Sequence, residues 1–144
     1  MPLCRAFFEE DAIEVGEAII ARNLALMATD DRAAVWWAEA PDGTPVALAS
    51  ASLTFGVEFG WAAEFEDLYV VPAWRGQGLA LRLTDLALTW ARDRGATEAL
   101  LVITPEAEAA QGLSRLYERL GFRRSARLLM TLDLRAGARS AVRG

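Results

Sequence analysis

The chain lacks residue types on which many functional sites depend. None of its 144 residues is a histidine or a lysine, so its 15 basic residues are all arginine, and Cys4 is its single cysteine. Zinc and other transition-metal sites draw mainly on histidine and cysteine, and a disulfide needs a pair of cysteines. We therefore expect no metal site and no disulfide. Histidine is also the commonest general base in enzymes, so a base in this protein has to be a carboxylate.

Long apolar runs and a basic surface are missing as well. The weakly polar stretches are interrupted, for example by Arg22 and Asn23, well short of the length of a membrane span. Glu9, Glu10 and Asp11 occupy the region where a signal peptide needs an apolar core. The formal net charge is −5, whereas a nucleic-acid-binding domain needs a basic stripe. These features predict a soluble, cytoplasmic protein that binds neither membranes nor nucleic acid.

What is present fits one folded domain, since 53% of the residues are hydrophobic. Periodicity and turn residues predict the element order β-α-β-β-β-α-β-α-β, with a hairpin turn at 41–44. The strands are expected at 3–8, 34–39, 45–55, 61–71, 99–103 and 127–134, and the helices at 11–27, about 79–94 and 113–122. The domain is expected to span 1–134, followed by a loose tail at 135–144 that is rich in Gly, Ala and Arg.

The most informative segment is 68–80, which reads Leu-Tyr-Val-Val-Pro-Ala-Trp-Arg-Gly-Gln-Gly-Leu-Ala. It is an apolar strand that leads through a glycine loop into a helix. The first N–H groups of such a helix lack intrahelical partners, and Gly76 and Gly78 let a ligand approach the backbone. The segment therefore predicts a phosphate-binding loop. A Walker motif needs a lysine and the dinucleotide fingerprint needs a glycine at Leu81, so neither motif applies.

Two motifs together resemble the GNAT family of N-acetyltransferases. The first is Arg-x-x-Gly-x-Ala at 75–80, preceded by Leu-Tyr-Val-x-Pro, and the second is Leu-Tyr-x-x-x-Gly-Phe at 116–122. The resemblance covers 3–134 and implies a single-domain α/β (α+β) acetyltransferase fold. In this fold helices flank a mixed, mostly antiparallel central sheet. The resemblance also implies acetyl-coenzyme A as co-substrate.

The resemblance assigns roles to residues of both motifs. Tyr117 would protonate the departing coenzyme A thiolate, and the backbone amides near Tyr69 and Val70 would polarise the thioester carbonyl. Family members often carry an asparagine seven residues before this tyrosine, where this chain has Ala110. The cofactor-binding residues implied by the resemblance are Leu68, Tyr69, Val70, Arg75, Gly76, Gln77, Gly78, Leu79, Ala80 and Leu81.

The strand before the glycine loop supplies three carboxylates that could take a proton from an acceptor amine. Alternation of side chains places Glu64 and Glu66 on one face and Asp67 on the other. By resemblance, Glu64 coincides with the base of the histone-acetylating branch of the family, whereas Glu66 is nearer the thioester, and a bulge would exchange their roles. Two alternatives remain open: all three are solvated edge charges, or the acceptor arrives neutral.

The sequence thus predicts an N-acetyltransferase that transfers an acetyl group from acetyl-coenzyme A to a small-molecule or peptide amine. Association of the chain into a homodimer stays open. One alternative is a non-catalytic module that binds acyl-coenzyme A, as a sensor or a partner subunit. Another is a structural domain with an incidental glycine loop.

Overall fold

The computed structural model describes residue 3 and residues 16–135. The elements in chain order are α2 (Glu17–Thr29), β1 (Ala33–Glu39), β2 (Pro45–Gly56), β3 (Gly60–Val70), the 3₁₀ helix η1 (Pro72–Trp74), α3 (Leu79–Asp93), β4 (Glu98–Leu101), α4 (Pro105–Gln111) and α5 (Leu113–Arg119). None of the helices in this described part is long and apolar enough to cross a membrane.

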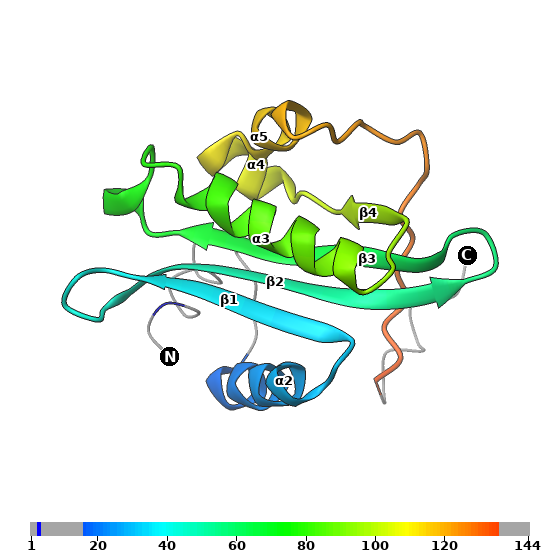
Figure 1. Cartoon of the computed structure of the whole chain (residues 1–144), viewed down its shortest axis with the longest axis horizontal. Helices are drawn as coiled ribbons and strands as arrows, with labels where there is room; N and C mark the ends of the chain where they lie inside the picture. Colours follow the sequence, from blue (N-terminus) through cyan, green and yellow to red (C-terminus); the bar gives the residue numbers. More distant parts are fainter. Residues whose placement is uncertain (1–2, 4–15, 136–144) are drawn as a thin grey trace.

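The centre of the molecule is a four-stranded mixed sheet in the order β1-β2-β3-β4 (Figure 1). β1, β2 and β3 pair antiparallel through successive hairpins, and β4 joins β3 in parallel after the α3 crossover. The predicted turn between β1 and β2 is confirmed. Gly43 adopts a positive φ of 86°, and the Asp42 carboxylate accepts a hydrogen bond from the Thr44 amide at 3.0 Å. The mixed, mostly antiparallel sheet flanked by helices agrees with the predicted fold class.

Helices cover the two faces of the sheet unequally. α3, α4 and α5 lie on one face and α2 lies on the other (Figure 1). The alternation of β2 explains this, because Ala47 and Ala49 pack against the first group while Leu48 packs against Ile20 of α2. Small alanine side chains let the helices of the first group approach the sheet closely. The main core therefore lies between the sheet and the group α3, α4 and α5.

Of the predicted strands, the one at 127–134 is wrong, and most of the one at 3–8 lies outside the described residues. Residues 127–134 alternate in sequence like a strand, yet the structure gives them neither strand nor helix and leaves them exposed. Alternation predicts which side chains share a face, but it supplies no partner strand. The strand expected at 3–8 begins with Leu3, which is helical in the structure, and its other residues lie outside the described part. The same holds for most of the predicted tail, at 136–144.

α4 is an element that the sequence reasoning missed. Thr104 caps its first turn by accepting a hydrogen bond from the Ala107 amide at 3.1 Å, and Pro105 occupies the first helical position. A threonine followed by a proline and a glutamate is a recognised helix start, so this signal was present in the sequence. The helix has only seven residues, too few for a periodic apolar face to show.

Candidate active site

The candidate site begins where β3 and β4 stop pairing. Their parallel ladder runs from Ala62 and Glu98 to Phe65 and Leu101. Beyond it lies a cavity of about 70 Å³, bounded by the two strands, α4 and α5. A water molecule takes about 30 Å³ in the liquid, so the cavity has room for a small chemical group. It is lined by Phe65, Glu66, Asp67, Leu68, Leu101, Val102, Ile103, Thr104, Ala107, Leu113 and Tyr117.

A β-bulge in β3 places two carboxylates beside this cavity. The register of β3 on β2 shifts between Phe65 and Asp67, so Glu66 is an extra residue opposite β2. The Ser52 hydroxyl donates a hydrogen bond to the Glu66 carboxylate, and the Ser50 hydroxyl donates one to the Asp67 carboxylate. The bulge therefore fixes both acidic side chains through serines of the neighbouring strand.

The bulge overturns one predicted orientation. Simple alternation placed Asp67 on the face opposite to Glu64. In the structure Asp67 pairs with Ser50 and Glu64 pairs with Ser52, and residues two apart on β2 share a face. Asp67 therefore lies on the same face as Glu64. The prediction was wrong because strict alternation does not hold across the extra residue Glu66 in the bulge.

The two candidate bases differ in their surroundings. Glu64 is half-buried and Glu66 is exposed. Burial raises the pKa of Glu64, and the negative charge of nearby Glu66 raises this pKa further. Glu66 and Asp67 line the cavity together with Tyr117, whereas Glu64 is not among the lining residues. Glu66 and Asp67 are thus lining residues of the same cavity as Tyr117, and the Asp67 charge acts on Tyr117.

Tyr117 is held in place by the end of its own helix. The Phe122 amide donates to the Tyr117 carbonyl at 3.1 Å, and the Gly121 amide donates to the Glu118 carbonyl at 3.1 Å. These two bonds, with Gly121 at φ 97°, form a Schellman motif. The ring of Phe122 packs edge-on against the ring of Tyr117 at 5.3 Å. The Gly-Phe part of the second motif therefore ends the helix and positions the tyrosine, as the predicted glycine cap implies.

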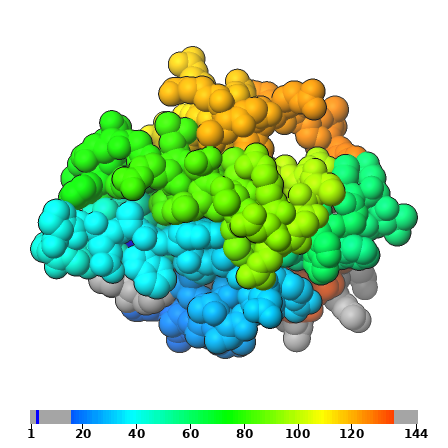
Figure 2. Space-filling model, in the orientation of Figure 1, coloured from blue at the N-terminus to red at the C-terminus, as the bar shows by residue number. Residues whose placement is uncertain are grey.

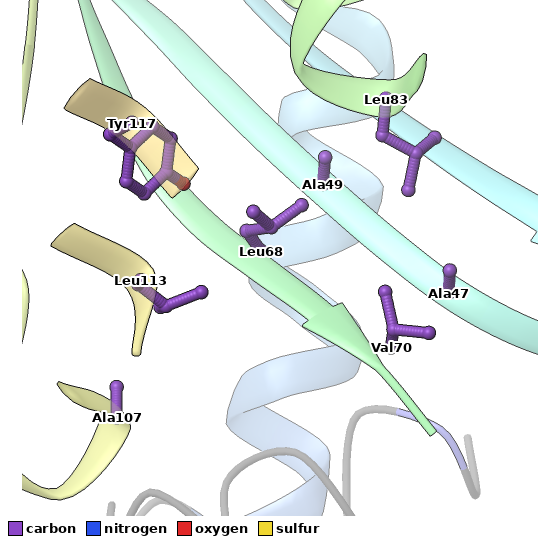
Figure 3. Close-up of a cluster of buried hydrophobic side chains, with 8 residues drawn as sticks. All are labelled: Ala47, Ala49, Leu68, Val70, Leu83, Ala107, Leu113 and Tyr117. Atoms are coloured by element: carbon purple, nitrogen blue, oxygen red, sulfur yellow. The ribbon is translucent and has the colours of Figure 1, made fainter. Parts of the chain in front are cut away.

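The Tyr117 side chain is directed at β3. The residue is only 6% exposed, and Figure 3 shows its hydroxyl pointing toward the strand near Leu68. Burial raises the pKa of Tyr117 well above its usual range, and the negative charge of Asp67 raises this pKa further. A tyrosine with its usual pKa of about 10 is already protonated at neutral pH, and the raised pKa of Tyr117 extends that protonated range further.

The glycine loop before α3 has a backbone conformation that favours glycine at two positions. Gly76 and Gly78 adopt positive φ angles of 80° and 81°, and Gly78 caps the N-terminus of α3. The first turn of α3 has no acidic residue, and no side chain caps its N–H groups. A Cβ added at either glycine would meet no atom within 4 Å. The glycines are therefore required by the backbone turn, and the space in front of them is open.

Arg75 ties this loop to the end of β3. Its Nε atom donates to the Val70 carbonyl at 2.8 Å, and its guanidinium lies 5.6 Å from the centre of the Tyr69 ring. The side chains of Leu68 and Val70 are buried in the core that faces α3 and α5 (Figure 3). Any ligand contact from this part of β3 must therefore use the backbone, as expected for the predicted amides.

Sequence reasoning missed the polar residues that support the acidic pair. Asp67 was assigned to the wrong face, and Ser50 and Ser52 were not considered. One signal was available, because the run Ala-Ser-Ala-Ser at 49–52 alternates small apolar and polar residues as expected for one buried and one polar face. The position of the bulge has no comparable signal.

Comparisons with known proteins agree with this geometry. The family model described as "Acetyltransferase (GNAT) family" matches residues 3–122. N-alpha-acetyltransferase 30 of Schizosaccharomyces pombe is 44% identical over 61 residues, which are 42% of this chain and 39% of the relative. Aminoglycoside N(6')-acetyltransferase type 1 of Klebsiella aerogenes is 44% identical over 69 residues, 46% of this chain and 45% of the relative. Each match thus spans less than half of the curated relative.

A solved structure shows the same fold over most of the chain. It is a predicted acetyltransferase from Clostridium acetobutylicum, determined with acetyl-CoA. The TM-score is 0.75 at 17% sequence identity, and the match covers 90% of this chain and 85% of the other. At this identity the likeness is one of fold.

Proposed function

Because this chain belongs to the acetyltransferase (GNAT) family, we propose that it transfers an acetyl group from acetyl-coenzyme A to an amine. The observation that carries the proposal is the cavity at the end of the β3–β4 ladder, which brings Glu66 and Asp67 together with Tyr117. The names of the two curated relatives, both N-acetyltransferases, support it. Nothing in the comparisons favours a non-catalytic module.

The residues of the glycine loop fit the pyrophosphate of coenzyme A. Residues 76–78 are exposed and lead into the first turn of α3, which lies at the positive end of the helix dipole and contains no acidic residue. The backbone of β3 at 68–70 leads from this loop to the cavity, and its amides would contact the pantetheine and the thioester carbonyl. The acetyl thioester supplies the group that is transferred.

The protein's own residues then handle two protons. The amine nitrogen forms a bond to the acetyl carbon as the carbon–sulfur bond breaks. Tyr117 donates its hydroxyl proton to the departing thiolate, and a carboxylate takes the proton that the amine loses. We assign the latter role to Glu66, because it lines the cavity with Tyr117, and keep Glu64 as the second candidate. The negative charge of Asp67 raises the pKa of Tyr117 and so favours the protonated phenol.

The need for a base follows from the acceptor. An alkylammonium with a pKa of about 10.4 is mostly protonated at pH 7, which costs about 4.6 kcal/mol to reverse. The chain has no histidine, so carboxylates on β3 are the available proton acceptors near the cavity. If the acceptor arrives neutral, this cost is met in solution and no side-chain base is needed.

The acceptor is proposed to be a cationic small-molecule or peptide amine. The net charge of −5 and the acidic cluster on β3 favour a positively charged substrate. The names of the relatives cover both classes, since one is an aminoglycoside acetyltransferase and the other an N-alpha-acetyltransferase. We also propose that the protein acts in the cytoplasm, which its single cysteine supports.

A screen of amine acceptors with a thiol-release readout tests the proposed function. Aminoglycosides, polyamines and short peptides with free N-termini are each incubated with acetyl-coenzyme A, and the product mass confirms that an acetyl group has been added. We expect one class to release thiol in proportion to the amide formed. Binding of coenzyme A without turnover on any acceptor would instead favour the non-catalytic module.

A further inference from the structure

The side of the cavity that α4 and α5 form is mostly apolar. Tyr117, Leu113 and Ala107 lie in a row on this side, and Leu68 of β3 lies opposite them (Figure 3). All four side chains are buried, and all four line the cavity. The Tyr117 hydroxyl is the polar group of this row. The cavity therefore extends from the proposed proton donor along an apolar surface to Ala107.

Ala107 has the smallest side chain among the residues that line the cavity. Every other apolar lining residue is branched or aromatic, so Ala107 is the position at which a short side chain leaves space. Ala107 lies on the inward face of α4 and is only 4% exposed, whereas Ala109 and Ala110 of the same helix are exposed. A change in side-chain size at 107 therefore changes the volume of the cavity, and the same change at 109 does not.

Hydrogen bonds hold this side of the cavity in place. α4 and α5 lie at the outer edge of the molecule, in the yellow and orange region of Figure 2. The Ala107 amide donates to the Thr104 hydroxyl at 3.1 Å. The Glu108 carboxylate accepts hydrogen bonds from the Ser114 amide at 2.9 Å and from the Ser114 hydroxyl at 2.6 Å, which joins α4 to α5. Separation of the two helices to widen the cavity would break the bonds to Glu108.

The volume of the cavity fits a small acyl group. It measures about 70 Å³. For comparison, an apolar cavity of about 150 Å³ binds benzene, which has six non-hydrogen atoms. On this scale the cavity has room for about three such atoms, the number in an acetyl group. A propionyl or butyryl group adds methylene groups that exceed this space.

We propose that the acyl group of the co-substrate lies in this cavity and that Ala107 limits its length to that of an acetyl group. The inference rests on the proposed function, in which Tyr117 protonates the sulfur to which the acyl carbon is bonded. The acyl chain then extends from Tyr117 past Leu113 to Ala107. One methylene group in an apolar pocket changes kcat/KM by about 10–200-fold, so the enzyme should prefer acetyl-coenzyme A to propionyl-coenzyme A by at least about 10-fold.

Substitutions that change the size of residue 107 should change the acyl preference. With the acceptor found in the screen, Ala107→Gly should raise kcat/KM for propionyl-coenzyme A relative to acetyl-coenzyme A by about 10-fold, and Ala107→Val should lower kcat/KM for acetyl-coenzyme A. Ala109→Gly and Ala109→Val are matched controls at an exposed position of α4 and should match the wild type. Because each ratio is measured on one protein, a loss of folded protein cancels. A wild type without acyl preference, or an unchanged ratio in Ala107→Gly, would overturn the proposal.

Binding without turnover gives a second readout. Coenzyme A, acetyl-coenzyme A and butyryl-coenzyme A share the nucleotide and the pantetheine and differ in the acyl group. In differential scanning fluorimetry, the wild type should need about 10-fold more butyryl-coenzyme A than acetyl-coenzyme A for the same increase in melting temperature, and Ala107→Gly should reduce this difference. Equal titration curves for the two thioesters in the wild type would overturn this inference and leave the proposed function standing. No shift with any of the three compounds would overturn both.

Discussion

At the scale of single residues, the site depends on what holds Tyr117. The Schellman motif at Gly121 and the ring contact with Phe122 fix the side chain, and burial keeps its hydroxyl protonated. The tyrosine therefore contributes a proton donor whose position comes from packing. Its role can be separated from its packing, because removal of the hydroxyl leaves the ring in place.

Tyr117→Phe should fold normally and bind coenzyme A as the wild type does. Because general acid catalysis contributes typically about 10²–10⁴-fold, kcat should fall within that range if thiolate departure limits the rate. Steady-state kinetics with the acceptor found in the screen measure the change, and circular dichroism checks the fold. Unchanged turnover would assign Tyr117 to the core alone.

The carboxylates of β3 should separate by their effect on the pH profile. Glu66→Gln is expected to lower kcat/KM, whereas Glu64→Gln is expected to leave it unchanged. Asp67→Asn should act differently, by lowering the pKa of Tyr117 toward its usual range, since a negative charge near the phenol is lost. Profiles that are identical in all three variants, and that follow only the pKa of the amine supplied, would show that no side chain acts as the base.

Glu64 also predicts a pH-dependent change in stability. Burial raises its pKa in the folded protein, so the folded state favours the protonated form, and the free energy of unfolding decreases as pH rises through this pKa. Glu64→Gln removes that loss. The variant should melt higher than the wild type near pH 7 and gain nothing below about pH 4, where an ordinary glutamate is protonated too. Equal differences at both pH values would contradict this account.

The sequence predicted the chemical identities at the site better than their geometry. The glycine loop, Tyr117 and its glycine cap were read from motifs whose local conformation is set by neighbouring residues. The grouping of Glu66 with Asp67 was not predictable in this way. It depends on a bulge, which arises from the register of two strands and has no local residue signature here.

At the scale of elements, local signals succeeded where a partner element was also present. β1, β2, β3 and α3 lie within a few residues of their predicted bounds, because each packs against the others in the core. The segment at 127–134 has an equally clear alternation, but no strand among the described residues 16–135 pairs with it. Strand formation requires hydrogen bonds to a neighbour, so the pattern alone does not determine it.

The loop before α3 gives the prediction at this scale. Gly78→Ala should lower the free energy of unfolding by about 1–2 kcal/mol, because an alanine is strained at φ 81°. It should also reduce the increase in melting temperature that coenzyme A produces, since the loop amides shift. Gly16→Ala is the matched control, because Gly16 caps α2 at φ −65° with open space around it. Equal effects of the two substitutions would mean that the loop conformation is not special.

At the scale of the whole molecule, an acidic protein is proposed to bind a polyanion. The net charge of −5 does not prevent this, because charges separated by more than about 8 Å are largely screened at physiological salt. What matters is the local field at the N-terminus of α3, where no side chain caps the N–H groups and the first turn has no acidic residue. The remaining acidic surface is then available to attract a cationic acceptor.

Binding of the co-substrate should therefore stabilise the folded protein as a whole. Acetyl-coenzyme A at 100 times its Kd should add about 2.7 kcal/mol to the free energy of unfolding. For a domain of this size that corresponds to an increase in melting temperature of roughly 10 °C. Differential scanning fluorimetry across a concentration series measures the shift, and free adenine serves as a control that lacks the pyrophosphate and the pantetheine. A melting temperature that does not change at millimolar acetyl-coenzyme A would contradict binding at the glycine loop, and with it the proposed enzyme and the non-catalytic alternative together.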